Sequence, residues 1–165
     1  MPRFVIRAGG IPGLLDMLRY ARETTIQAVE GLTVAELDHR FDAESNSIGA
    51  LLRHIASVEA YYQVHTFEER EFTAAESDRW LGGLEMRHEV TGRTLQSYMD
   101  TLATVRERTE DELASRDDDW LFRVEPWAGD DANNHWKWFH VCEDEISHRG
   151  QIRWLRKRLP RRSAT

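Results

Sequence analysis

Four long stretches of this chain carry apolar residues at steps of three and four, a spacing typical of amphipathic helices. The pattern constrains the fold strongly, because each such helix has one face that must be buried against another element. The stretches run from Pro12 to Glu30, from the Ser45-Asn46-Ser47 cap to His65, from Arg93 to Ser115, and from the Asn133-Asn134 cap to Leu159. With no convincing sheet elsewhere, they predict an all-α fold, a four-helix bundle.

The connections between these helices contain most of the glycine and proline. A short turn after the first helix holds Thr33-Val34-Ala35-Glu36, which matches a capping box. Residues 66–92 carry Gly82-Gly83 and many charges, so we expect a loop with one short helical turn near Trp80. This long second-to-third connection leaves room for a crossover. Residues 119–127 lack helical spacing and are expected to be extended.

Composition indicates one domain. The 165 residues are 41% hydrophobic, which is enough for one buried core, and we expect a single domain over 1–165 with a basic tail at 160–165. No stretch approaches the roughly 18 apolar residues that span a bilayer. The first residues are also too interrupted for a secretory signal, so we expect a cytoplasmic protein with no membrane partner.

The net charge of -7 argues against nucleic acid as a partner, because phosphate binding needs a positive surface or stripe. The segment from Arg149 to Arg162 does carry seven bases and no acid. We interpret these cations as complements to the dipole of a C-terminal helix that also keep its outer face soluble.

The single cysteine, Cys142, excludes two kinds of site. It cannot form an intramolecular disulfide, and a metal site with paired Cys-x-x-Cys motifs is impossible. Any metal site must therefore use histidine and carboxylate ligands. Cys142 itself is expected to pack at a helix contact rather than to act as a nucleophile.

Ionisable residues interrupt the apolar face of the last helix. At about 100° per residue, His148 lies within the arc formed by Val141 and Ile152, and Asp144 lies one turn earlier on the same face. An Asp and a His four residues apart that face into a bundle can chelate a cation. Glu145 lies three residues before His148, and the spacing does not choose between the two carboxylates.

A second helix would have to supply a further ligand, and the candidate is His54, at the edge of the second helix's apolar face. Two imidazoles and one carboxylate suit Zn²⁺ and also Ni²⁺ or Fe²⁺, with positions left for water or substrate. The alternative interpretation is structural. An inward histidine is often a hydrogen-bonded core residue, and an Asp four residues away can be merely its partner.

Two runs of residues resemble a known family. The run Ser47-Ile48-Gly49-Ala50-Leu51-Leu52-Arg53-His54 and the later run His148-Arg149-Gly150-Gln151, in this order, are similar to the DinB/YfiT-like superfamily of metal-binding four-helix bundles. The similarity extends from Leu14 to Leu159, although its middle part is carried only by the helix pattern.

The resemblance implies a metal site formed by His54, Asp144 and His148. It implies one divalent ion there, Zn or Ni first, with Fe or Mn as alternatives. Many family members have a histidine at the position of Asp144. The Asp found here is closer to the branch that places a carboxylate between two histidines, as mycothiol-dependent maleylpyruvate isomerases do with Glu.

Family members with known activity are largely transferases and isomerases that use mycothiol, bacillithiol or glutathione. The resemblance therefore implies a thiol S-transferase in which the metal activates a small-molecule thiol toward an electrophile. Two alternatives stay open, a metal-dependent hydrolase on the same ligands and a non-catalytic, stress-associated metal-binding bundle. The resemblance also allows a homodimer, although the sequence shows no interface.

Other residues of the second and last bundle segments have expected roles. Gly150 costs about 1 kcal/mol in a helix interior, so we expect another helix to approach closely there. Gln151 shares the ligand face and is a candidate for orienting a ligand. The aromatic residues expected in the core and at helix interfaces are Trp136, Trp138, Tyr61 and Tyr62.

Overall fold

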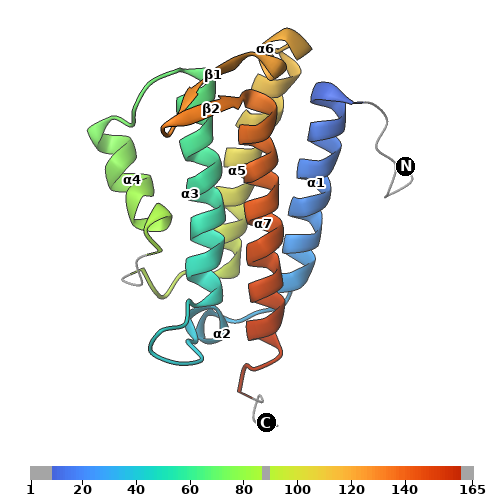
Figure 1. Cartoon of the computed structure of the whole chain (residues 1–165). Coiled ribbons are helices and arrows are strands. Elements are labelled where there is room, and N and C mark those ends of the chain that lie inside the picture. Colours follow the sequence, from blue (N-terminus) through green and yellow to red (C-terminus); the bar gives the residue numbers. More distant parts are fainter. Residues whose placement is uncertain (1–8, 87–89, 161–165) are drawn as a thin grey trace.

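A computed structural model describes residues 9–86 and 90–160, and within them four long helices pack side by side (Figure 1). These helices are α1 (Gly10–Val29), α3 (Ile48–Phe67), α5 (Leu95–Ala114) and α7 (Asn134–Arg156). α1 contacts α5 and α7, and α3 contacts the same two helices, so each bundle helix borders two others. The predicted all-α four-helix bundle is confirmed.

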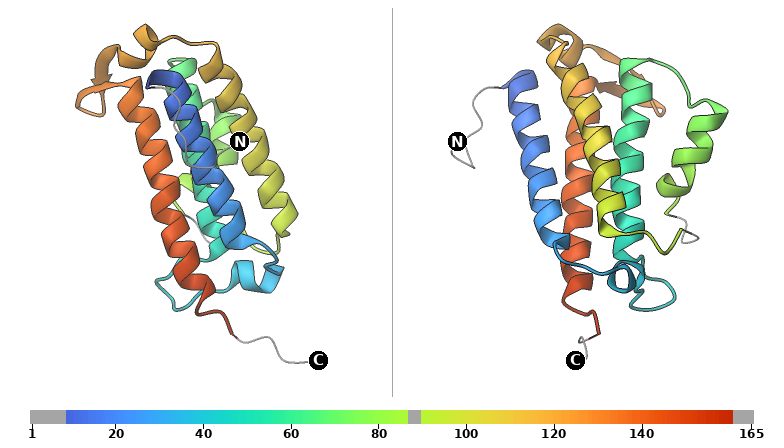
Figure 2. Two further views of the ribbon diagram at one scale, coloured as in Figure 1. Left: turned by 90° about the vertical axis from the view of Figure 1, so that its right-hand side faces the viewer. Right: turned by 180° about the vertical axis from the view of Figure 1, so that it is seen from behind.

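The chain crosses over between the second and third bundle helices. α3 and α5 run in the same direction, opposite to α1 and α7 (Figure 1 and Figure 2). A shorter helix, α4 (Ala74–Leu84), lies within this crossover and packs on the outer side of α3. None of the described helices is long and apolar enough to cross a membrane.

The sequence signals at the helix ends act as expected. Gly31 has a positive φ of 75° just after α1, a conformation that glycine adopts at little cost. Thr33 and Glu36 form the predicted capping box at the start of α2 (Val34–Asp38). The Ser47 and Asn133 side chains accept backbone hydrogen bonds at the starts of α3 and α7.

The helical turn expected near Trp80 is present but longer than predicted, because α4 occupies eleven residues of the segment that was expected to be mostly loop. A second capping box starts this helix, with Thr73 and Glu76 bonding each other's backbone N–H groups. Arg70 also pairs with Glu76 at 2.7 Å. The helix is polar along much of its exposed side, so apolar periodicity did not reveal it.

The segment before α7 is only half extended. Residues Asp118–Phe122 form the short helix α6, capped by the side chain of Asp117. The expected extended chain follows as β1 (Val124–Trp127), which pairs antiparallel with β2 (Asp130–Asn133). The turn residues Ala128 and Gly129 both have positive φ, as two-residue hairpins require. The expectation of no sheet is therefore wrong, because the structure contains this one small hairpin.

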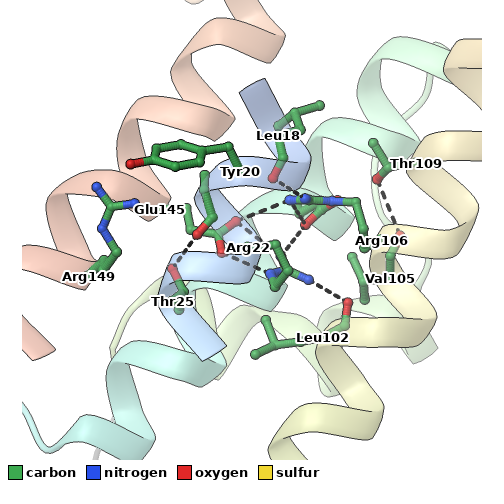
Figure 3. A network of polar contacts seen from close by, with 12 residues as sticks. Leu18, Tyr20, Arg22, Thr25, Leu102, Val105, Arg106, Thr109, Glu145 and Arg149 are labelled. Atoms are coloured by element: carbon green, nitrogen blue, oxygen red, sulfur yellow. Dashed lines mark hydrogen bonds and ion pairs between the residues drawn. The ribbon is translucent and has the colours of Figure 1, made fainter. Parts of the chain in front are cut away.

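A layer of charge divides the apolar core into two clusters. One cluster surrounds Leu14 and Trp138, and the other surrounds Leu51 and Ile152. Four buried charged residues lie between the clusters, one from each bundle helix, and we call them the buried charge quartet. In the order α1, α3, α5 and α7 they are Arg22, Glu59, Arg106 and Glu145. Figure 3 shows its arginines reaching across the bundle. No spacing or motif in the sequence indicates this layer.

Every member of the quartet contacts both residues of opposite charge. Arg22 lies 2.7 Å from Glu59 and 2.8 Å from Glu145, and Arg106 lies 2.7 Å and 3.1 Å from the same two carboxylates. Each arginine also donates to a backbone carbonyl, that of Leu102 or Leu18 (Figure 3). Burial alone would raise the pKa of Glu59, but the charges of Arg106 and Arg22 outweigh it and lower this pKa to about 2.

Candidate metal centre

Three of the predicted residues meet where α3 and α7 face each other. His54 comes from α3, and Asp144 and His148 come from adjacent turns of α7. Asp144 Oδ1 lies 3.6 Å from His54 Nε2 and 3.3 Å from His148 Nε2. One candidate ligand atom from each residue lies within 4.8 Å of the other two. The two imidazole rings meet edge to face at 4.8 Å.

These distances fit a divalent metal ion. Nitrogen and oxygen ligands bind such ions at about 2.1 Å, and a tetrahedral ion then separates neighbouring ligand atoms by about 3.4 Å. The two separations that involve Asp144, 3.3 and 3.6 Å, lie on either side of this value. The site is also mostly buried, since both histidines are less than a tenth exposed. Three protein ligands would leave further coordination positions open for a small molecule.

The second nitrogen of each histidine is held by an oxygen. His54 Nδ1 lies 3.0 Å from the carbonyl oxygen of Gly83, which can only accept a hydrogen bond, so Nδ1 carries the proton. His148 Nδ1 lies 3.3 Å from Gln151 Oε1, so Gln151 contacts the ring that it is expected to orient. In the neutral rings, both Nε2 lone pairs then face the Asp144 carboxylate. Two imidazole nitrogens and one carboxylate that converge in this way form a favourable binding site for a cation.

Electrostatics at the site already favour positive charge. Burial opposes the ionised form of Asp144, but the rings of His148 and His54, when they carry a proton on Nε2, outweigh it and lower the pKa of this carboxyl. Burial likewise opposes an imidazolium at His148, yet its hydrogen bond with Asp144 raises the pKa of the ring overall. The buried Asp144 carboxylate therefore keeps its negative charge at neutral pH. A metal ion that binds there would compete with protons for the histidine nitrogens.

The close packing of α4 on α3 positions the Gly83 carbonyl. A Cβ atom at Gly83 would lie 2.0 Å from Ser57 Oγ, and one at Gly82 would lie 2.4 Å from the Arg53 guanidinium. Both glycines are buried where α4 meets α3. The two helices can lie this close because neither glycine has a side chain. In the sequence, the pair Gly82-Gly83 indicates a loop and gives no sign of the role of its backbone. The Thr73-x-x-Glu76 capping box was the available signal.

Replacing Gly83 by alanine should weaken metal binding by about 10–100-fold, the usual effect of losing a group that supports a ligand. The added methyl group would push α4 off α3 and remove the acceptor of His54 Nδ1. Titration with a divalent ion, followed by calorimetry, measures the change. Gly150→Ala is the matched control, because a Cβ there meets nothing within 4 Å. Equal affinities in both variants would contradict this role for α4.

The two neighbouring carboxylates of α7 lie in different surroundings. Glu145 points away from the histidines into the buried charge quartet, where both arginines bind it. Of the two carboxylates, Asp144 is the one that lies beside His54 and His148, which favours it over Glu145 as the candidate ligand. Cys142 packs in the apolar core, where burial first and then the charge of Glu145 raise the pKa of its thiol to about 11. His140 bonds Glu143 on the surface at 3.2 Å.

Aromatic residues lie next to the site along α3. Tyr62 is 7% exposed, and its ring contacts those of Trp127 and His140 at 5.6 and 6.0 Å. Burial first, then Tyr61 and Asp144, raise the pKa of Tyr62 to about 12, so the phenol is protonated at neutral pH. Trp138 is fully buried as expected, whereas Trp136 is half exposed and lies outside the core.

A profile of the mycothiol S-transferase family matches residues 13–160, nearly the whole chain including all three site residues. The chain belongs to this family. The match confirms the resemblance to the DinB/YfiT-like superfamily, and it spans both motif runs and the crossover between them. No curated protein matches the chain.

Solved structures share the fold of this mycothiol S-transferase family member. A DinB-like protein from Bacillus cereus is similar at 18% identity with a TM-score of 0.66, covering 88% of this chain and 90% of that one. A conserved protein from Enterococcus faecalis also has 18% identity and a TM-score of 0.66, with 87% and 93% covered. A Streptococcus pneumoniae protein has 15% identity and a TM-score of 0.67, with 93% and 92% covered. At these identities the likeness concerns the fold.

Proposed function

We propose that the chain is a metal-dependent thiol S-transferase that joins a low-molecular-weight thiol, mycothiol or a related compound, to an electrophile. The observation that supports this most directly is the convergence of His54, Asp144 and His148 within 4.8 Å in a chain of the mycothiol S-transferase family. A divalent metal bound there would stabilise thiolate over thiol and so supply a nucleophile at neutral pH.

The residues around the site have definite tasks in this proposal. His54, Asp144 and His148 would hold the ion, Zn or Ni first, and the single carboxylate leaves a net positive charge to attract a thiolate. Gly83 and Gln151 fix the two rings so that each Nε2 faces the ion. Tyr62, whose pKa Asp144 helps to raise, stays protonated and would be a hydrogen-bond donor near the site for a bound molecule.

The sulfur must come from outside the chain. Cys142 is the one cysteine in the sequence, it is buried, and its raised pKa keeps the thiol protonated. In the transfer, the lone pair of the incoming sulfur forms the S–C bond, and the leaving group departs with the electron pair of its own bond to carbon. The thiol proton is released to solvent. No protein nucleophile takes part.

An assay with and without thiol tests this function. Metal-loaded protein is mixed with mycothiol and chlorodinitrobenzene, and the thioether is followed by absorbance and mass spectrometry. We expect product only when thiol, metal and the intact site are all present, and a loss of at least a hundredfold in His148→Ala. His140→Ala, on the same helix but bonded to Glu143 on the surface, should keep the rate.

Other outcomes would replace the proposal. Metal-dependent hydrolysis of an ester without any thiol would indicate a hydrolase on the same ligands. Metal binding with neither reaction, but with a large loss of thermal stability on chelation, would indicate a non-catalytic bundle that the metal holds together.

A further inference from the structure

A cavity of about 420 Å³ lies between α4 and α5, and we call it the α4–α5 cavity. This volume is within the usual range for small-molecule sites. Leu52 and Arg53 of α3 line it, with Arg79 and Trp80 of α4 and Tyr98 of α5. In the right-hand view of Figure 2, α3 stands between α5 and α4. The described residues that line the cavity include none of the three residues of the candidate metal centre, so it is a separate site.

Positive charge is concentrated around this cavity. Of the described residues that line it, three are arginines, Arg53, Arg79 and Arg93, and one is an acid, Asp78. The three arginines come from different segments, namely α3, α4 and the residues just before α5. The chain as a whole carries a net charge of -7, so the charge around the cavity is opposite to that of the whole chain. Such a set of arginines attracts an anion.

Two of the three arginines have no ion-pair partner among the described residues. Arg79 and Arg93 are both exposed, and neither hydrogen bonds a described residue. Arg70, before α4, is by contrast bound by Glu76 at 2.7 Å. The guanidinium of Arg79 lies over the ring of Trp80 at 4.5 Å. A guanidinium that rests on an aromatic face keeps N–H donors at its edge, where a ligand can accept from them.

The electrostatics of Tyr98 indicate that the positive charge acts inside the cavity. This side chain is buried, and burial first, then the charge of Asp38, raise the pKa of its phenol. The charges of Arg93 and Arg53 act in the opposite direction, because they favour the ionised phenolate. Both guanidinium groups are therefore close enough to act on a charge at this wall. They would favour an anionic ligand for the same reason.

The cavity also has an apolar wall. Leu52 and Ala56 belong to the second core cluster, and the partly exposed Trp80 packs against that cluster. A flat ring can pack on Trp80 beside the guanidinium of Arg79. Arginine binds a planar carboxylate through two parallel hydrogen bonds. The lining therefore favours a carboxylate that is joined to a ring over a bare inorganic anion, which would make no use of the apolar wall.

We infer that the α4–α5 cavity is a binding site for a small aromatic carboxylate. Arg79 and Arg93 bind the carboxylate group, the ring packs against Trp80, and Arg53 adds positive charge from α3. Because the cavity is separate from the candidate metal centre, this inference does not depend on the proposed transfer reaction.

Titration of the full chain with benzoate tests the site. A chelator is present, so that benzoate cannot bind a metal ion. We expect the indole N–H resonance of Trp80, assigned by its loss in Trp80→Phe, to shift along a saturating curve with a dissociation constant of about 1 mM. Benzamide has the ring without the charge, and inorganic phosphate has the charge without the ring. Each should bind at least tenfold more weakly than benzoate.

Three results would overturn the inference. The first is an unshifted Trp80 resonance at about 10 mM benzoate, well above the expected dissociation constant. The second is benzamide that binds as tightly as benzoate, which would show that the arginines do not recognise the ligand. The third is phosphate that binds as tightly as benzoate, which would show that the cavity takes any anion and has no use for a ring.

Substitution of the arginines tests their part in binding. Arg79→Gln and Arg93→Gln should each raise the dissociation constant of benzoate at least fivefold. Both side chains are exposed and unpaired among the described residues, so the variants should unfold at the wild-type temperature. Arg153→Gln, at an exposed position of α7 that does not line the cavity, is the matched control and should bind like wild type. Equal affinities in all three variants would contradict the assignment.

Discussion

Replacing Glu59 by glutamine is expected to lower the free energy of unfolding by about 3–5 kcal/mol, the usual cost of removing one partner from a buried ion pair. Glu59 is fully buried and bonds both Arg22 and Arg106, so its loss leaves two buried cations sharing one carboxylate. The midpoint of thermal unfolding should fall by roughly 8–16 °C in a chain of this size. Calorimetry and urea unfolding measure both quantities.

A surface ion pair is the control for this change. Arg19 and Glu110 lie 2.7 Å apart but are partly exposed, and Glu110→Gln should cost no more than about 1 kcal/mol. A second variant, Glu59→Leu with Arg106→Met, removes one charge of each sign and leaves Arg22 paired with Glu145. It should recover much of the lost stability, because the remaining charges balance. Equal losses in Glu59→Gln and Glu110→Gln would contradict the account of the quartet.

Acid should remove the stability that the ionised Glu59 carboxylate contributes to the folded chain. The pKa of Glu59 is about 2 in the folded chain and near 4.5 in its ordinary range. A lowered folded pKa adds stability that is fully present above the ordinary pKa and is lost as pH falls toward the folded one. The stability difference between wild type and Glu59→Gln should therefore shrink between about pH 5 and pH 2. A difference that stays constant over this range would show that the charge is not the cause.

Local signals in the sequence were enough for the bundle. The apolar spacing of residues 12–30 and the Ser47 and Asn133 caps act within a few residues, so the helices they predict are present. The same 100° geometry placed His148 and Asp144 on one inward face, and the structure brings His54 to them. Apolar periodicity does not indicate α4, because this helix is polar along much of its exposed side, and its contact with α3 depends on two glycines that pack against Arg53 and Ser57.

Tertiary pairing explains what else the sequence did not reveal. Glu145 and Asp144 are neighbours on α7, and spacing alone made either a candidate ligand. The choice depends on Arg22 and Arg106, which lie 123 and 39 residues away and draw Glu145 to the other side of the helix. Only contacts between distant helices distinguish these carboxylates. By binding Glu145, the quartet also fixes the rotation of α7 that turns Asp144 toward His54.

Removal of one metal ligand is the other change with a large expected effect. The wild-type chain should bind about one Zn²⁺ or Ni²⁺ per molecule, and His148→Ala should retain almost none after dialysis against micromolar metal. Only His54 and Asp144 would remain, and two ligands cannot hold an ion at that concentration. The loss should exceed the 10–100-fold expected for groups that only support a ligand. Metal analysis of the purified proteins measures the stoichiometry.

The free energy of unfolding, measured with and without metal, tests the same site independently. At a metal concentration of about 100 times the dissociation constant, binding should stabilise the folded chain by about 2.7 kcal/mol, and a chelator should reverse this. His148→Ala should show neither change, whereas His140→Ala should behave like wild type because its ring bonds Glu143 on the surface. The buried charge quartet does not touch the imidazole rings in the described contacts, so the chelated protein should remain folded. Equal metal content in wild type and His148→Ala would exclude the three residues as the metal centre.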